Sequence, residues 1–361
     1  MKNLSMIFRY TLLLWLGVAV ASCSLNEEAV STPNQEKVPV LFTSDVNVSA
    51  STKVHGDMGN LWSEHDTVGV FMVDEGGNLA ENIVDGALNI PYRVRDFNVN
   101  RSELLPAGDT IWYPALGKVN FVLYYPYKQT LTLDSIYTVD LSDQSQPEAI
   151  DLMYAKSQTA YGADRKQSVE VVFEHQLTKL VFLLQRGGKI TSLSGLTLEL
   201  EDVALTTTFN LSSAKLADAG RGGTDKLSAN IVSATTDEAR AEAIVLPVKN
   251  LDESKLYLFV TINGTDYSAV LPRPTNAGTE DLEAGNLYTY SVLVNQDGIS
   301  LTGKLTPWNE VAAGNTGFGE VPYPTSPIRI AMSSRIPAGT FMMGSPASEA
   351  NRGVNEAQHE V

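Results

Sequence analysis

The stretch LYLFVTINGTDYSAVL (256–271) alternates apolar residues with other residues up to a two-residue turn signal. Successive side chains of a strand point to opposite faces, so every second residue of its first half would share one face. These residues are Leu256, Leu258, Val260 and Ile262. Asn263 and Gly264 follow, and such a pair tolerates the positive φ angles of a tight hairpin turn. The stretch therefore predicts a half-buried β-hairpin.

The rest of the chain after residue 37 repeats this pattern in short apolar runs. Clear examples are VPVLFT (38–43), TVGVFMV (67–73), VNFVLYYPY (119–127), TKLVFLLQ (178–185) and LYTYSVLVN (287–295). Turn signals such as DEGGN (74–78) and GRGGT (220–224) separate them. Regular short strands with Gly, Asn and Asp turns favour an all-β antiparallel sandwich. Only DLMYAKSQTA (151–160) suggests a short turn of helix.

The first 22 residues have the features of a secretory signal. Lys2 and Arg9 precede an apolar run at 12–21, which is too short for the roughly 20 residues that span a bilayer. The end of this segment, Val20-Ala21-Ser22-Cys23, resembles a bacterial lipobox. The resemblance implies cleavage between Ser22 and Cys23 and acylation of the Cys23 thiol.

Cys23 is the only cysteine, so the chain offers it no disulfide partner. Several acyl chains on one residue anchor stably, because each buried CH₂ contributes about 0.8 kcal/mol. The alternative is an ordinary secretory signal with an incidental cysteine. The polar, aromatic-poor residues 23–37 are typical of a flexible tether. These features predict an outer-membrane lipoprotein that is exposed on the cell surface.

The net charge of −16 argues against nucleic acid as a partner. Loss of Lys2 and Arg9 with the signal would bring it to −18, and no basic stripe offsets this charge. The length and the 43% hydrophobic content suffice for two domains with sizeable cores.

Five stretches, in this order, resemble signatures of the fimbrillin family of Gram-negative anaerobes. They are LWSEHDTVGVFM (61–72), FVLYYPY (121–127), DLMYA (151–155), FEHQLTKLVFLL (173–184) and LEAGNLYTYSVLVNQDGISLTGKLTPWNE (282–310). The resemblance covers about residues 38–311. It implies two tandem transthyretin-like β-sandwich domains, at 38–165 and 166–311.

The family resemblance also implies a mode of assembly. Polymerising members are cleaved after a basic residue near the first strand, and a strand of a neighbouring subunit then fills the groove. Here Lys53 follows the first expected strand, and no arginine lies between Arg9 and Arg93, which does not fit arginine-directed cleavage. The chain also continues past the second sandwich. We therefore expect an accessory or anchoring subunit rather than the bulk subunit of a stalk.

Individual residues within these stretches have structural interpretations. Trp62 and Trp308 are large apolar rings, which favours burial. Asp66 precedes an expected strand and would cap its start. His175 could be a ligand, but a lone histidine in a sheet is more often a hydrogen-bonded structural residue, and the family resemblance favours that role.

The end of the chain has a different character. Residues 312–335 read as a Gly/Pro-rich linker. The following segment, IPAGTFMMGSPASEANRGVNEAQHEV (336–361), resembles the opening of a sulfatase-modifying, formylglycine-generating-enzyme-like domain. At this length we expect it to be a truncated stub that cannot bury a core of its own. The alternative is that it adds a strand to the sandwich.

No catalytic, metal-binding or cofactor-binding residues are predicted. The four histidines have no metal-ligand spacing, and nucleophile-elbow and phosphate-loop motifs are missing from the sequence. The leading hypothesis is a lipid-anchored fimbrillin-like subunit, anchor or adhesin. Its partners would be the outer membrane through Cys23, other fimbrial subunits by strand addition, and host or bacterial glycans or proteins. The alternative is a surface-targeting stalk for a formylglycine-generating-enzyme-like protein.

Overall fold

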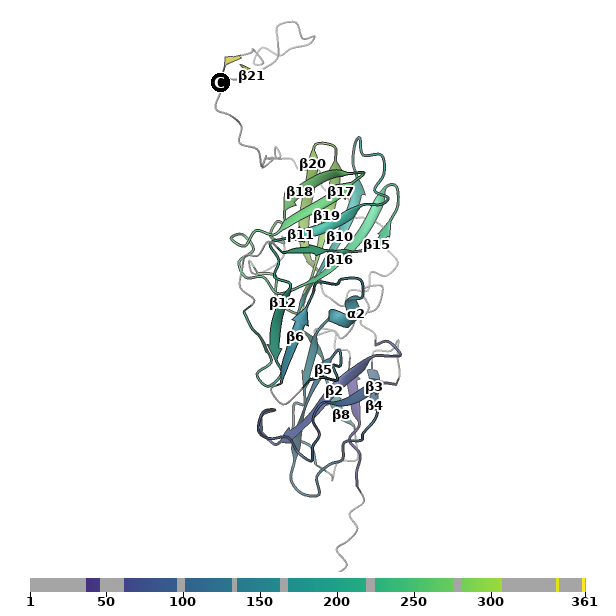
Figure 1. The fold of residues 1–361 in the computed structure, drawn as a ribbon, viewed down its shortest axis with the longest axis vertical. Coiled ribbons are helices and arrows are strands. Elements are labelled where there is room, and N and C mark those ends of the chain that lie inside the picture. The colour runs from purple at the N-terminus through teal and green to yellow at the C-terminus, as the bar shows by residue number, and fades with distance from the viewer. Residues whose placement is uncertain are drawn as a thin grey trace, which may run out of the picture.

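The computed structural model describes residues 37–45, 62–95, 101–131, 135–162, 168–218, 225–274, 281–306, 342–343 and 359–360. Its strands form two bodies that follow one another along the longest axis (Figure 1). The lower body holds the earlier strands and the upper body the later ones. The all-β prediction is confirmed, since strands dominate and the one described helix has four residues.

The lower body is one sheet of eight strands, in the order β8-β1-β4-β3-β2-β5-β7-β9. Their bounds are β1 (Phe42–Asp45), β2 (Thr67–Asp74), β3 (Ile90–Val94), β4 (Arg101–Pro106), β5 (Val119–Tyr125), β7 (Met153–Lys156), β8 (Val169–Val171) and β9 (Glu174–His175). Only Val172 and Phe173 separate β8 from β9, although these strands stand at opposite ends of the order. The sheet must therefore curl until its ends nearly meet, around a core that includes Trp62 and Phe121.

The first sheet continues past the domain boundary expected near residue 166. β8 pairs in parallel with β1, and β9 pairs with β7, so its hydrogen-bonded strands extend to His175. The next strand, β10, starts at Thr178 and already belongs to the upper body.

The upper body contains two facing sheets. One has the order β15-β16-β10-β19-β20, with β15 (Asn230–Ala234), β16 (Glu238–Val245), β10 (Thr178–Arg186), β19 (Leu287–Asn295) and β20 (Gly298–Thr306). The other has the order β14-β11-β17-β18, with β14 (Lys226–Ser228), β11 (Thr197–Glu201), β17 (Tyr257–Ile262) and β18 (Thr265–Val270). Pairing within them is antiparallel except between β10 and β19.

The hairpin predicted from residues 256–271 is confirmed. β17 and β18 pair from Tyr257↔Val270 to Ile262↔Thr265. Asn263 and Gly264 have φ angles of 50° and 77°, as the tight turn requires. Leu258, Val260 and Ile262 are buried, whereas the residues between them are half-buried.

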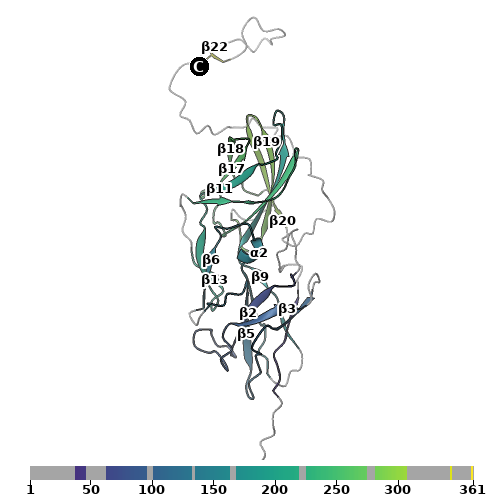
Figure 2. The same cartoon turned by 45° about the vertical axis from the view of Figure 1, so that its right-hand side comes forward.

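A third, small sheet joins the two bodies. It has the order β13-β12-β6, with β6 (Ile136–Asp140), β12 (Thr206–Asn210) and β13 (Lys215–Leu216). β6 comes from the part of the chain that builds the lower body, and β12 follows a strand of the upper one. The two lie side by side in both views (Figures 1 and 2). Tyr137 and Phe209, opposite each other in this pair, are buried in a core that continues into the upper body.

The helical turn expected within 151–160 is wrong in position. The helix α2 spans Pro147–Ile150, with proline in its first turn, and Met153–Lys156 is strand β7. Tertiary context decides this difference, because Met153 and Ala155 are needed between β5 and β9 to fill the lower core. No helix of the described residues is long and apolar enough to cross a membrane.

Most of the tail lies outside the described residues. The tail has two short described strands, β21 (Met342–Met343) and β22 (His359–Glu360), which pair antiparallel with each other. Among the described strands they have no other partner. The resemblance of 336–361 to an enzyme domain therefore stays a prediction.

A buried ion pair lies on the β10–β16 ladder. Lys179 Nζ is 2.7 Å from Glu242 Oε2, and both side chains are about 5% exposed or less. The guanidinium of Arg240 also contacts Glu242. Burial disfavours the charged carboxylate, but the two cations outweigh it and hold the pKa of Glu242 below its usual range.

We predict that Lys179→Met lowers the free energy of unfolding by about 3 kcal/mol, because Glu242 would stay buried with one cation fewer. The double variant Lys179→Met/Glu242→Leu should recover most of that loss. Chemical denaturation of the three proteins measures both values. Equal losses in the single and double variants would contradict the prediction.

The same carboxylate gives the wild-type protein an acid-sensitive contribution. A depressed folded-state pKa stabilises the fold above the ordinary value of about 4.5, and the contribution disappears as the pH falls through the folded-state pKa. Below about pH 4.5 the wild type should therefore lose stability relative to the double variant, which lacks this carboxylate.

Candidate functional site

The first strand, β1, is the candidate functional site, because it is a short strand held between two neighbours from distant parts of the chain. β1 lies between β4, to which it is antiparallel, and β8, to which it is parallel. Phe42 pairs with Leu104 on one side and with Val169 on the other. We call the space that β1 fills between these two neighbours the β1 slot.

The inward side chains of β1 are apolar at its start. Val40 and Phe42 are buried, whereas Leu41 between them is 39% exposed. The Phe42 ring meets the edges of Tyr92 and Phe121 at right angles, with ring centroids 5.1 Å away in both cases. Such edge-to-face contacts add about 0.5–1.5 kcal/mol each to the burial of the ring. Phe42 is therefore the apolar anchor of the strand.

Hydroxyl groups surround the other end of β1. The Trp62 indole donates a hydrogen bond to Ser44 Oγ at 3.1 Å, and the Thr43 hydroxyl lies 2.8 Å from Ser168 Oγ. Ser102 stands opposite Ser44, and its buried Oγ has no hydrogen-bond partner in the structure. A small polar residue therefore suits this end of the slot.

The segment before β1 is fixed by the loop at 111–113. Val40 N donates to the carbonyl of Ile111 at 2.9 Å, and Tyr113 N donates to the carbonyl of Val38 at 3.0 Å. Between them Pro39 and Trp112 face each other in an isolated bridge. The extended chain thus continues from β1 back to Val38.

A buried tyrosine hydroxyl also contacts this segment. Tyr92 donates a hydrogen bond from its hydroxyl to the carbonyl of Val40 at 3.0 Å. Burial raises the pKa of Tyr92 well above its usual value, so the hydroxyl keeps its proton and stays a donor.

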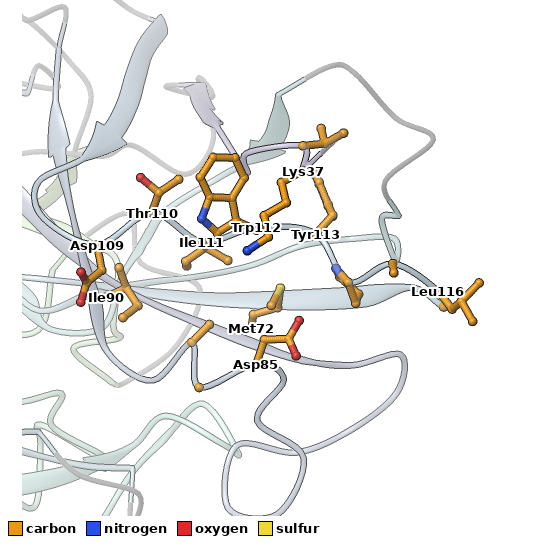
Figure 3. Close-up of a pocket in the computed structure, with 16 residues that line it drawn as sticks. Lys37, Met72, Asp85, Ile90, Asp109, Thr110, Ile111, Trp112, Tyr113 and Leu116 are labelled. Carbon is orange, nitrogen blue, oxygen red and sulfur yellow. The ribbon is translucent and has the colours of Figure 1, made fainter. Parts of the chain in front are cut away.

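A groove with a volume of about 1060 Å³ opens at the start of this segment. We call it the Trp112 groove. Its lining runs from Lys37 and Val38 across Met72, Asp85–Ala87 and Ile90 to the loop 109–117. Figure 3 shows Trp112 and Lys37 on one side, Asp85 and Met72 on the other, and Leu116 pointing away at the loop tip. Trp112 is 39% exposed and Leu116 is 88% exposed.

The residues singled out from the sequence fall in different places. Ser22, Cys23, Lys53 and Trp308 lie outside the described residues. Trp62 is buried as predicted, with Tyr125 and Phe173 against its ring.

Asp66 is the cap that the sequence predicts. It accepts a hydrogen bond from Ser63 N at 2.6 Å and another from the Tyr125 hydroxyl at 3.0 Å. Burial first, and then the Asp66 carboxylate, raise the pKa of Tyr125 above its usual range.

His175 is a buried structural residue, as expected. Its Nδ1 lies 2.9 Å from Asp151 Oδ1, and both side chains are shielded from solvent. Among the residues that the structure describes, no group of three His, Cys, Asp or Glu side chains could hold a metal ion.

The chain matches the model of the fimbrillin-like family over residues 52–308, and it belongs to that family. It is 27% identical over 310 residues to Fim1C of Bacteroides uniformis, a protein named as a fimbrium subunit, and this covers 84% of our chain and 96% of the relative.

Solved structures show the same fold. One, described as a cell adhesion protein of Bacteroides uniformis, has a TM-score of 0.60 and 25% identity, covering 76% of our chain and 99% of its own. Another of the same description, from Bacteroides ovatus, has a TM-score of 0.58 and 21% identity, covering 75% and 98%.

The sequence pattern predicts the strand at β1, but no local pattern indicates the Trp112 groove. The exposed Trp112 sits in IWYP (111–114), which has neither clear alternation nor a motif. Its place beside Pro39 arises from pairing between segments far apart in the sequence.

We predict that Phe42→Ala lowers the free energy of unfolding by about 3–5 kcal/mol, because it removes a ring that Tyr92 and Phe121 enclose. Leu41→Ala on the same strand is the matched control and should cost less than about 1 kcal/mol, since Leu41 faces outward. Urea denaturation measures both values. Similar losses for the two variants would mean that the stability contributed by β1 does not depend on its inward-facing side chains.

Proposed function

We propose that this chain is a structural or adhesive subunit of a surface fimbria. It reaches the surface anchored by lipid on Cys23 and joins its neighbours by strand addition at the β1 slot once cleavage has released β1 together with that lipid. Membership of the fimbrillin-like family and the similarity to a fimbrium subunit support the fimbrial role. The position of β1 between two strands is the observation that carries the proposed assembly step.

Removal of β1 would expose the backbone groups of β4 and β8 together with the apolar cradle of Phe42. Unpaired strand edges readily accept a strand from another chain. Lys53 is the only lysine or arginine between β1 and β2, so cleavage there would separate β1 from the rest of the sheet. Lys53 would thus be the cleavage site, in place of the arginine that arginine-directed cleavage needs.

A later stretch of the chain repeats the β1 pattern. Residues 328–334, IRIAMSS, align with residues 38–44, VPVLFTS, so that both carry apolar residues at three alternate positions and serine at the fourth. The aligned inward residues are Ile328, Ile330, Met332 and Ser334 for Val38, Val40, Phe42 and Ser44. We propose that this segment of one subunit fills the β1 slot of another.

The alignment also sets a limit to the added strand. The residue after Ser334 is Arg335, which would stand opposite Arg101, where β1 has Asp45. Like charges directly opposite each other disfavour pairing. The proposed strand therefore ends at Ser334.

The test uses residues 24–361 with a specific protease site in place of the residues around Lys53. Cleavage and release of β1 should convert monomers into a ladder of larger species, because each subunit then has both an open slot and a donor segment. Size-exclusion chromatography with light scattering follows the change.

Met332→Asp is the matched control and should leave the cut chain monomeric, because a charge would enter the cradle of Phe42. Monomers after complete release of β1, or equal polymerisation of the uncut chain, would contradict strand addition.

The lipid anchor has its own test. In a Bacteroides host, wild-type chains not yet cleaved at Lys53 should appear in the outer-membrane fraction with a mass that matches residues 23–361 plus acyl groups. Cys23→Ala should keep its signal and lose the acyl mass, because the modified thiol is absent. An unmodified wild-type thiol, or unchanged processing of Cys23→Ala, would contradict the anchor.

A further inference from the structure

We propose that the Trp112 groove is a second docking subsite, which binds the proline-rich run PYPTSP (322–327) from a second copy of this chain. This inference rests on the proposed function, because the strand in the β1 slot brings the run to the groove. The ligand of this groove, which lies outside the paired strands, would be an extended proline-rich peptide.

The alignment with β1 determines where the run would lie. Lys37 and Val38 line the groove in the intact chain. When Ile328 takes the place of Val38, Pro327 takes the place of Lys37. Residues 322–326 precede Pro327 in the chain. They would therefore extend from the position of Lys37 into the opening of the groove.

The composition of the run suits the walls of the groove. PYPTSP has three prolines in six residues, a composition that favours the extended polyproline II conformation. Such segments bind grooves lined by aromatic side chains and lose little conformational entropy on binding. Trp112 offers a partly exposed indole, and the half-buried Ile90 provides apolar surface in the same groove.

The charges of groove and run are complementary. Asp85 and Asp109 are exposed on the groove, and the one cation of its lining, Lys37, leaves together with β1. The stretch 321–348 has two arginines and no acidic residue, although the whole chain has 42 Asp and Glu against 26 Lys and Arg. An acid-free segment is thus brought to an acidic groove, which favours correct pairing.

One of these arginines falls next to the indole. Arg329 aligns with Pro39, whose backbone pairs with Trp112 in the intact chain. The aligned position points away from the slot, as the alternation along β1 shows. A guanidinium there can interact with the face of Trp112 or with the carboxylate of Asp109.

The experiment measures two synthetic peptides against one acceptor. The acceptor is the cleavable chain of residues 24–361 carrying Ile330→Asp and Met332→Asp, so that its own segment cannot fill a slot. After cleavage and removal of the released β1 fragment, fluorescence anisotropy gives the affinities of the strand peptide (328–334) and of the extended peptide (321–334).

The extended peptide should bind about tenfold more tightly than the strand peptide, the gain that one buried aromatic anchor supplies. Trp112→Ala in the acceptor should remove this gain and should weaken the strand peptide much less, because that peptide has only Arg329 beside the indole. Trp112→Phe should keep most of the gain. Replacing the three prolines of the extended peptide by alanine should also remove it.

The outcomes separate the inference from the proposed function. If the strand peptide binds and the extended peptide binds less than twofold more tightly, the groove does not bind the run, but strand addition stands. The groove assignment is also wrong, and strand addition stands, if Trp112→Ala weakens the binding of both peptides by the same factor. If neither peptide binds but a peptide of residues 38–44 does, both the donor segment and the groove assignment are wrong.

Discussion

Two central strands of the lower sheet, β2 and β5, are buried on both faces, and the joint between the two bodies depends on this constraint. In β2, Val68, Val70 and Met72 face the lower core, whereas Phe71 and Val73 face a core that continues into the upper body. β5 divides its side chains in the same way, with Phe121 inward and Tyr124 outward. Because one pair of strands belongs to two cores, neither face can be exposed without loss of apolar burial.

The small β6–β12 sheet acts together with that constraint. β6 extends from the lower body and β12 from the upper body, and their five residue pairs bring Tyr137 and Phe209 into the shared core. Tyr154 of β7 contacts Phe209 with ring centroids 5.6 Å apart. Hydrogen bonding and aromatic packing thus cross the boundary together.

The β1 slot differs from these joints because a single short strand completes it. β1 contributes one large anchor, Phe42, and a polar end at Ser44, and its backbone pairs with β4 on one side and β8 on the other. A strand of this kind can be replaced by another with the same alternation, since the backbone groups of β4 and β8 carry no sequence information. The anchor and the hydroxyl end decide which sequence fits, and the Trp112 groove extends that selection beyond the strand.

The sequence by itself determined where several of the longer strands lie, which face of the hairpin strand at 257–262 is buried, and the structural roles of Trp62, Asp66 and His175. Alternation and turn residues are local signals, so the hairpin at 257–270 could be predicted residue by residue. Only the tertiary structure decided the partners: the parallel pairs β1–β8 and β10–β19, the bridge between β6 and β12, the place of α2 and the Trp112 groove. A strand has the same two-residue period whichever strand it pairs with, and the choice of partner depends on contacts between residues far apart in the chain.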